Sequence, residues 1–170
     1  ATIPGGATEI IVIDNASSDA TSGGLARLAA EGGVKVLRNE RNESYAHANN
    51  QGAALSAAPV LVFLNNDTVL LPGWLEALER TFEADPSVGI QGGKLLYPDG
   101  RIQHAGIVYG PVNADGLLLH YHLHLLQDKG APCVNSAREF QMVTGALLAI
   151  RRELFDRVGG FDEQYYFGHE

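Results

Sequence analysis

The sequence predicts an α/β protein whose sheet is mostly parallel. Three short apolar runs, at residues 9–13, 34–37 and 60–64, alternate with two segments of helical character. The run at 60–64 is apolar at every position, which is typical of a strand buried on both faces by helices. Because strand and helix in alternation form parallel βαβ units, we expect a parallel sheet with covering helices.

The first two helices are predicted from capping residues and helix breakers. Residues 17–19, Ser-Ser-Asp, are favourable N-cap residues for a helix that Gly32-Gly33 ends. Ser44 can cap the second helix, and Pro59 terminates it because proline lacks the backbone N–H that a helix interior needs. A predicted strand follows each of these helices.

A third helix is predicted after Pro72, and a less regular second half follows it. Trp74, Leu78 and Phe82 recur at every fourth position and form one apolar helix face. The remaining elements are predicted as two strands joined by a turn, a long loop with little periodicity, a further strand, and a short helix ended by glycines: 88–97, 101–109, 111–138, 142–150 and 151–158.

Composition indicates a globular protein of one domain and excludes some classes of partner. The 170 residues carry 12 Lys and Arg against 20 Asp and Glu, a formal net charge of −8. There is no basic stripe, so nucleic acid is not expected as a partner. Cys133 is the single cysteine, which fits a reducing compartment. The apolar stretch at 117–126 is interrupted by histidines and is shorter than the ~20 residues of a membrane span, so no transmembrane segment is predicted.

Both ends resemble cuts in a longer protein. Residues 1–8 form a segment with Pro and Gly that runs straight into a strand, without a start methionine. At the other end, the chain stops at Gly168-His169-Glu170, directly after an aromatic stretch. We therefore expect a fragment, or the core, of a larger protein.

Polar residues follow two of the predicted strands, and small residues interrupt a third. These clusters are Asp14-Asn15, Asn65-Asn66-Asp67 and Thr144-Gly145-Ala146. Ligands of open α/β sheets bind at the carboxyl ends of the strands, so the clusters are candidate site residues. A carboxylate beside amide oxygens, as at Asp67, is also the kind of oxygen set that holds Mg²⁺ or Mn²⁺ on a diphosphate. An Asn/Asp turn at a strand end is the alternative interpretation.

Six groups of motifs lie in a fixed order along the chain: 9–19, 48–52, 63–68 with 72–75, 95–106, 144–146 with 151–155, and 159–163. In this order and at this spacing they resemble the family 2 glycosyltransferases, over nearly the whole chain apart from 111–138. The resemblance implies the GT-A fold, in which a Rossmann-like nucleotide-binding half with a mostly parallel central sheet is joined to a smaller acceptor-binding half. The two halves are expected at 1–97 and 98–170 of a single domain.

The activity implied by this resemblance is inverting transfer of a sugar from a nucleoside diphosphate sugar to an acceptor hydroxyl. The acceptor would be a glycan, a lipid or a protein, in the synthesis of cell-wall or other polysaccharide, glycolipid or glycoprotein. An acidic protein would receive an anionic donor through a divalent cation or through helix N-termini, and the resemblance implies Mn²⁺ or Mg²⁺. The implied location is the cytoplasm, including a peripheral position at the inner face of the membrane.

The resemblance also implies residues that bind the donor. Asp14, with Asn15, matches the segment whose carboxylate accepts a hydrogen bond from the nucleobase, and an Asx turn is the alternative. Asn49 and Asn50 fall where many relatives carry Arg-Asn facing the donor, so a positive charge is missing at Asn49. Solvated amides on a helix surface are the alternative for this pair.

Metal and acceptor positions are implied in the same way. Asp67 matches the last carboxylate of the metal-binding Asp-x-Asp motif, whose first position is Asn65 here, with Asn66 between them. One carboxylate suffices, because Mg²⁺ keeps waters and takes its other charge from the phosphates. Thr144-Gly145-Ala146 matches the segment on the acceptor side, where a β-bulge is the alternative.

The general base is expected near the end of the chain. In relatives an aromatic stretch leads into Glu-Asp, and the Asp is the usual base. Residues 165–170 follow this pattern as far as Glu170, so the expected Asp would be the next residue. Glu170 is the candidate base within the chain, and we expect residues 1–170 alone to bind the donor but to transfer sugar poorly.

The histidines and two other functions offer alternatives. His104 is expected to be a structural residue. His120, His122 and His124 alternate at strand spacing like a metal face, but an exposed loop or edge is favoured because no carboxylate stands at matching spacing. A sugar-nucleotide nucleotidyltransferase would need a Gly-rich basic phosphate loop within 1–60, where none occurs. A non-catalytic nucleotide-sugar-binding module is the third alternative.

Overall fold

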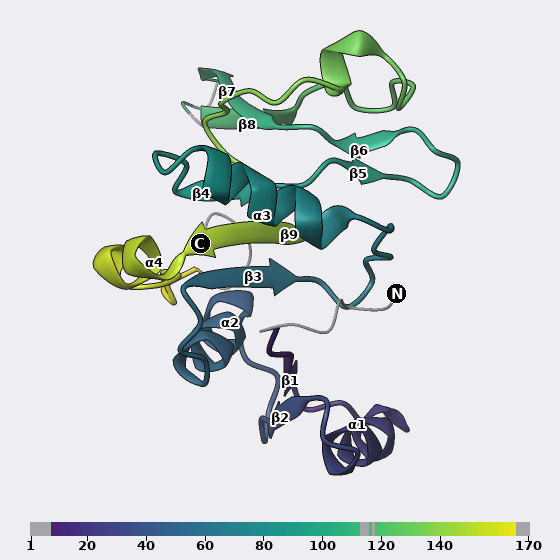
Figure 1. Cartoon of the computed structure of the whole chain (residues 1–170), viewed down its shortest axis with the longest axis vertical. Helices are drawn as coiled ribbons and strands as arrows, with labels where there is room; N and C mark the ends of the chain where they lie inside the picture. Colours follow the sequence, from purple (N-terminus) through teal and green to yellow (C-terminus); the bar gives the residue numbers. More distant parts are fainter. Residues whose placement is uncertain (1–7, 113–115, 117, 166–170) are drawn as a thin grey trace. The chain divides into compact units, whose positions relative to one another are not determined.

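The computed structural model describes residues 8–112, 116 and 118–165 (Figure 1). This described part contains four α-helices, one short 3-10 helix and nine β-strands, and none of its helices is long and apolar enough to cross a membrane. The chain divides into two compact units. Unit 1 contains the described residues up to Leu61 and those from Arg151 onward, and unit 2 contains Val62–Ile150. The chain thus returns to its first unit at Arg151.

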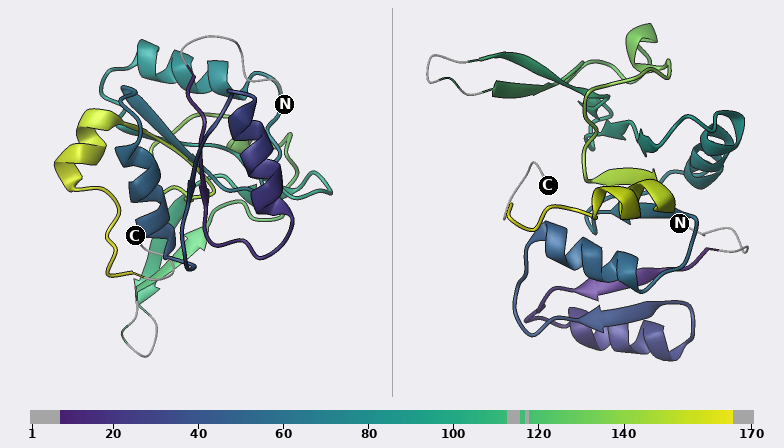
Figure 2. Two further views of the ribbon diagram at one scale, coloured as in Figure 1. Left: turned by 90° about the horizontal axis from the view of Figure 1, so that it is seen from below. Right: turned by 90° about the vertical axis from the view of Figure 1, so that its left-hand side faces the viewer.

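Unit 1 is built on a parallel pair of strands. β1 (Ile11–Asp14) and β2 (Lys35–Arg38) are hydrogen-bonded in parallel, and α1 (Thr21–Ala30) connects them. α1 and α2 (Tyr45–Ala54) flank this pair (Figure 2). The arrangement confirms the predicted βαβ unit, because parallel neighbours need a crossover connection such as a helix.

Local hydrogen bonds define the starts of these helices. Ser44 Oγ accepts from the backbone N–H of His47 at 3.1 Å, so Ser44 is the N-cap of α2, as predicted. At α1, Asp19 Oδ1 accepts from the backbone N–H of Thr21 at 2.9 Å, while Ala20 occupies the N-cap position. Asp19, predicted as an N-cap residue, therefore supports the start of α1 from the position before the N-cap.

α4 (Arg152–Val158) explains why the chain returns to unit 1. The guanidinium of Arg152 donates from Nη2 to Ala53 O at 2.9 Å and to Ser56 O at 2.8 Å. Ala53 belongs to the last turn of α2 and Ser56 lies two residues beyond it, so Arg152 holds the end of this helix. α4 ends at Gly159, which has a φ of 86°, as its sequence predicts.

A sheet of order β3-β9-β4 carries the apolar core of unit 2. The strands are β3 (Val60–Leu64), β4 (Ile90–Gly92) and β9 (Leu147–Arg151), and the boundary between the units falls within β3 and before the last residue of β9. β4 and β9 are antiparallel. Buried side chains of these strands include Phe63, Leu147 and Ala149.

α3 (Trp74–Ala84) supplies the predicted apolar helix face to unit 2. Leu78 and Phe82 are buried, and Trp74 is half-buried. The helix begins at Trp74 rather than directly after Pro72. Gly73 takes the N-cap position with a φ of 80°, a left-handed conformation that glycine adopts without a steric cost.

The strand predicted at 88–97 is divided into β4 and β5 (Leu95–Leu96), which belong to different sheets. Glycine at the break allows β9 to approach closely, because a Cβ on Gly93 would lie 2.3 Å from Leu147 Cδ2. β5 pairs instead with β6 (Ile102–His104). The prediction of one continuous strand is therefore wrong at this point.

The strand predicted at 101–109 is also divided, into β6 and β7 (Ile107–Val112). Gly106 separates them with a φ of 110°, outside the β region. The strand predicted from Met142 begins only at Leu147, as β9. Met142 forms an isolated bridge to β7 instead.

The prediction of a long loop over 111–138 is wrong in part. β8 (Leu118–His122) pairs antiparallel with β7, and a 3-10 helix covers Pro132–Val134 (Figure 2). Gly110 makes room for this pairing, because a Cβ there would lie 2.2 Å from the ring of Tyr121. The strand depends on cross-strand contacts with β7, which local periodicity does not reveal.

Candidate functional site

Asp14 ends β1 with its carboxylate almost fully buried. Its exposed fraction is 3%, and Oδ1 accepts a hydrogen bond from the backbone N–H of Ser17 at 2.9 Å. Oδ2 forms an ion pair with the guanidinium of Arg38, which stands opposite Asp14 in the parallel register. The hydrogen bonds from Ser17, and then the charge of Arg38, lower the pKa of Asp14 below its ordinary value of 3.8, so the group is charged at neutral pH.

These contacts form the turn that the sequence offers as the alternative role of Asp14. A carboxylate has about four lone-pair positions, and the backbone N–H of Ser17, the side chain of Ser17 and the guanidinium of Arg38 use three of them. The remaining position accepts hydrogen bonds only, which suits a ring N–H or an amino group of a nucleobase. The turn is thus present, and the contact of Asp14 to a base stays a prediction.

The amide of Asn15 is saturated with hydrogen bonds inside the protein. Its Nδ2 donates to Asn42 Oδ1 and Glu43 O, both at 2.8 Å. Its Oδ1 accepts from the Glu43 backbone N–H and from Asn39 Nδ2, both at 3.0 Å, and Asn39 Nδ2 also donates to Gln51 Oε1 at 2.9 Å. An amide has two donors and two acceptor positions. Asn15 therefore shapes this loop, and its role in substrate binding stays a prediction.

Arg38 is a candidate site residue that the sequence analysis does not identify. Its side chain is 48% exposed beside the buried Asp14, and its Nη2 donates to Ser17 O at 2.8 Å. The fixed guanidinium supplies a positive charge near the strand end, where Asn49 supplies none. The parallel register could have revealed it, because Asp14 and Arg38 are the last residues of adjacent strands.

Asn49 and Asn50 are consecutive residues of α2 with different partners. Asn49 Nδ2 donates to Tyr45 O in its own helix at 2.9 Å. Asn50 Nδ2 donates to Phe161 O and to Glu163 Oε1, both at 2.9 Å. Both N–H donors of Asn50 are thus occupied by the turn after α4, and its contact to the sugar donor stays a prediction.

Within unit 2, the end of β3 lies beside the segment predicted for the acceptor. The Asn65 backbone N–H donates to Ala146 O at 3.1 Å, and the Ala146 N–H donates to Thr144 Oγ1 at 3.3 Å. The segment 144–146 is half-buried, whereas the turn after Asn65 leaves Asn66 and Asp67 exposed. Two of the three predicted clusters are therefore adjacent in this unit.

Asp67 and its neighbours offer oxygen ligands but no complete metal site. Across residues 8–112, 116 and 118–165, no group of three or more His, Cys, Asp or Glu could hold a metal ion. Asp67 offers an exposed carboxylate, and Asn65 and Asn66 offer amide oxygens. Such a donor set fits Mn²⁺ or Mg²⁺, which complete their coordination with water and substrate phosphates.

His104 is buried and paired with His122. Its exposed fraction is 2%, and its Nδ1 lies 3.2 Å from His122 Nδ1. Burial, and then the proximity of His122, lowers the pKa of His104 to about 4, so the ring is neutral at physiological pH. This agrees with the predicted structural role. His120 is exposed on β8 and His124 lies in the turn after it, so the alternating histidines do not form one metal face.

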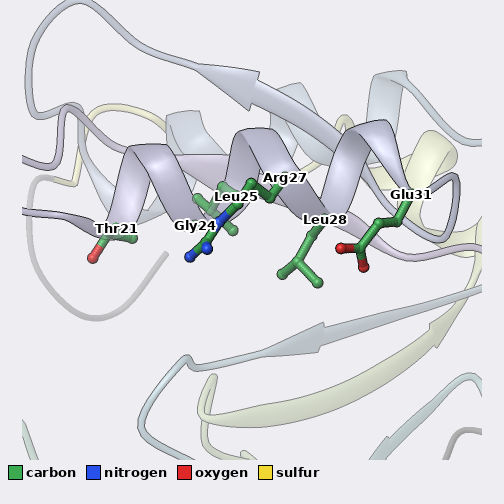
Figure 3. A pocket seen from close by; sticks show the side chains of 6 residues that line it. All are labelled: Thr21, Gly24, Leu25, Arg27, Leu28 and Glu31. Carbon is green, nitrogen blue, oxygen red and sulfur yellow. The ribbon is translucent and has the colours of Figure 1, made fainter.

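A hollow along α1 contains none of the residues that the sequence singles out. It is lined by Thr21, Gly24, Leu25, Arg27, Leu28 and Glu31 (Figure 3). Leu28 is 47% exposed there, between oppositely charged side chains. The hollow has no cluster of polar groups that could orient a sugar nucleotide.

Glu170, the candidate base, lies outside the described residues.

In unit 1, the parallel strand pair ends at the buried carboxylate of Asp14. Unit 2 carries the exposed carboxylate of Asp67. Residues 2–159 match the family model described as glycosyl transferase family 2. The chain therefore belongs to this family, and the resemblance seen in the motifs is confirmed.

Curated relatives include much longer proteins. The uncharacterized protein y4gI of Sinorhizobium fredii is 39% identical over 91% of this chain and 17% of its own length. The O-antigen biosynthesis protein RfbC of Myxococcus xanthus is 32% identical over 92% of this chain and 12% of its own length. The chain thus spans only a small part of each of these relatives.

Two solved structures are similar in fold. The mannosyltransferase PcManGT from Pyrobaculum calidifontis, in complex with GDP-Man and Mn²⁺, has a TM-score of 0.61 at 21% identity, over 91% of this chain and 38% of that chain. GalNAc-T7 with UDP, GalNAc and Mn²⁺ has a TM-score of 0.63 at 23% identity, over 95% of this chain and 32% of that chain. Both are GT-A glycosyltransferases, so the predicted GT-A fold is confirmed.

Proposed function

We propose that the chain transfers a sugar from a nucleoside diphosphate sugar to an acceptor hydroxyl with inversion at the anomeric carbon. The observation that carries this proposal is the family match over residues 2–159. The acceptor is a glycan, a lipid or a protein, in polysaccharide, glycolipid or glycoprotein synthesis. The proposed location is the cytoplasm, with a peripheral position at the inner face of the membrane.

The base-binding role falls to the end of β1. Asp14 is charged at neutral pH and accepts a hydrogen bond from an N–H of the base. Arg38 is held by Asp14 and by Ser17 O, so its guanidinium is already oriented before an anionic donor arrives. Residues 1–97 form the nucleotide-sugar half in this proposal, and 98–170 form the acceptor half.

The diphosphate is received at the end of β3. Asp67, with the amide oxygens of Asn65 and Asn66, would hold Mn²⁺ or Mg²⁺ there, and the bound ion would neutralise the diphosphate leaving group. The exposed oxygen set at the turn supports this assignment. An acidic chain, with a net charge of −8, needs such a counter-charge to bind its donor.

The acceptor hydroxyl is activated on the other side of the sugar. Thr144-Gly145-Ala146 is proposed to line the acceptor side, next to Asn65. The hydroxyl oxygen attacks the anomeric carbon and gives its proton to a carboxylate base, for which Glu170 is the candidate in this chain. The bond from the anomeric carbon to the diphosphate oxygen breaks, and the diphosphate leaves with the electron pair. A single displacement of this kind inverts the configuration.

Incubation of the full protein with a panel of nucleotide sugars and Mn²⁺ tests this function. We expect transfer to an added acceptor, or slow hydrolysis of one donor, with NMR showing inverted configuration in the product. Exchange of pyrophosphate with a sugar nucleotide would identify a nucleotidyltransferase instead. Binding of a nucleotide sugar without turnover would identify a binding module.

A further inference from the structure

We propose that three side chains, His47, Asn50 and Glu163, form a clamp that positions the chain after α4 for catalysis. The clamp also includes the backbone of Phe161. All four residues lie in unit 1, on α2 and on the turn that follows α4. The inference rests on the proposed function, to which it adds positioning residues.

The amide of Asn50 holds both backbone groups of one residue. Asn50 Oδ1 accepts from the Phe161 N–H at 2.9 Å, and Asn50 Nδ2 donates to Phe161 O at 2.9 Å. One planar side chain thus fixes the peptide groups on both sides of Phe161, which lies 111 residues further along the chain. Such a pair of bonds restricts translation and rotation of the turn more than a single bond does.

Glu163 closes the clamp with its carboxylate. Its Oε1 accepts from Asn50 Nδ2 at 2.9 Å, and its Oε2 lies 2.8 Å from His47 Nδ1. His47 and Asn50 are three positions apart, so they present their side chains on the same face of α2. The hydrogen bonds from Asn50, and then from His47, lower the pKa of Glu163 below its ordinary value of 4.5, so the carboxylate is charged at neutral pH.

The turn itself is shaped to fit the clamp. Gly160 has a φ of 81°, and a Cβ there would lie 2.7 Å from Asn50 Oδ1. The ring of Phe161 packs edge-on against Tyr45 of α2 and against the buried Phe155 of α4, with ring centroids 5.6 Å apart in each pair. The hydrogen bonds of Asn50 and the ring contacts of Phe161 therefore fix the same turn after α4.

α2 also connects this clamp to the proposed base-binding end. Gln51, next to Asn50, accepts from Asn39, and Asn39 in turn donates to Asn15, which directly follows Asp14. One rigid helix is thus tied both to the strand end of Asp14 and to the turn at Phe161. The residues proposed to carry the base follow this turn in the sequence. Misplacement of a reacting group by about 1 Å can cost about 100-fold in rate, so a fixed turn supports catalysis.

Replacement of the clamp residues in the full protein tests the inference. We expect Asn50→Ala and Glu163→Ala to lower kcat by about 10- to 100-fold, with no change in the Kd of the nucleoside diphosphate measured by calorimetry. Glu163→Gln should recover most of the rate. Its amide oxygen can accept from Asn50, and its NH₂ group can donate to Nδ1 of a neutral His47. Gln164→Ala, a change at the exposed neighbouring position, is the matched control and should keep the wild-type rate.

Several outcomes would overturn the inference. Wild-type kcat in Asn50→Ala and Glu163→Ala would show that the clamp does not position the reaction. Equal inactivity of Glu163→Gln and Glu163→Ala would assign the effect to the charge of Glu163 itself. If Asn50→Ala does not fold, His47→Ala and Glu163→Ala and their double variant serve instead, and additive losses in kcat would contradict a shared clamp. Absence of nucleotide binding in the wild-type protein would refute the proposed function rather than the clamp.

Discussion

At the scale of single residues, the neighbours of Asp14 determine its charge and how many further hydrogen bonds its carboxylate can accept. Hydrogen bonds from Ser17 and the ion pair with Arg38 keep the carboxylate ionised. An amide at this position would still accept from the Ser17 N–H, but it could not form the ion pair with Arg38. Asparagine is therefore an informative replacement.

We predict that Asp14→Asn weakens binding of the preferred nucleoside diphosphate by about 10- to 100-fold, because a hydrogen bond to a charged acceptor is lost. Calorimetric titration with UDP, TDP and GDP measures the effect. Asp99→Asn is the control, since Asp99 is also paired with an arginine, Arg101, at 2.6 Å but lies outside the candidate site. Unchanged affinity in Asp14→Asn would exclude Asp14 from base recognition.

The buried His104 leads to a prediction about how the stability of the fold depends on pH. Its pKa in the folded protein is about 4, against an ordinary value of 6.5, so the unfolded chain binds a proton more readily than the folded one between these values. Stability from this group is therefore complete above about pH 6.5 and is lost as the pH falls toward 4. We expect the melting temperature of the wild-type protein to fall over this window, and His104→Gln to reduce the fall. A parallel fall in both proteins would contradict the assignment.

At the scale of elements, local patterns predict the first half of the chain well. The strands at 11–14, 35–38 and 60–64 and the helix capped by Ser44 lie where apolar runs and capping residues place them. The second half depends on contacts that a local pattern does not contain. β8 is formed through its pairing with β7, and the break after β4 reflects close packing against Leu147.

The glycine at this break provides a stability test. A Cβ at Gly93 would lie 2.3 Å from Leu147 Cδ2, so Gly93→Ala should destabilise the protein by about 1–3 kcal/mol through overpacking. Gly23→Ala is the matched control. Gly23 lies within α1 with nothing within 4 Å of an added Cβ, so this change should stabilise the protein by about 0.5–1 kcal/mol. Chemical denaturation measures both, and equal effects of the two changes would refute the packing argument.

The candidate site is predictable only where it follows strand ends. Asp14 and Asp67 are found from the sequence because Asp14 directly follows an apolar run and Asp67 belongs to the polar cluster that directly follows another. Arg38 requires the register of β1 and β2, and the partners of Asn50 lie 111 and 113 residues away. The place of Asn15 at a strand end suggests a ligand contact, while in the fold both donors and both acceptor positions of its amide are used within the protein.

At the scale of the whole molecule, the acidic charge of the chain sets the central requirement. A protein of net charge −8 that receives an anionic donor needs a cation, and its described residues hold no preformed cluster of three metal-ligating side chains. In the proposed function, metal and nucleotide complete each other's site. Binding of one should strengthen binding of the other by the same factor.

Titration of the preferred nucleoside diphosphate with and without Mn²⁺ tests this requirement most directly. We predict that Mn²⁺ tightens nucleotide binding by about 5- to 150-fold, a typical range for coupled ligands. Asp67→Ala should abolish this gain, whereas Glu83→Ala, which removes an exposed carboxylate of α3, should keep it. Nucleotide affinity that is the same in Mn²⁺ and in EDTA, and that Asp67→Ala leaves unchanged, would contradict the metal-dependent mechanism.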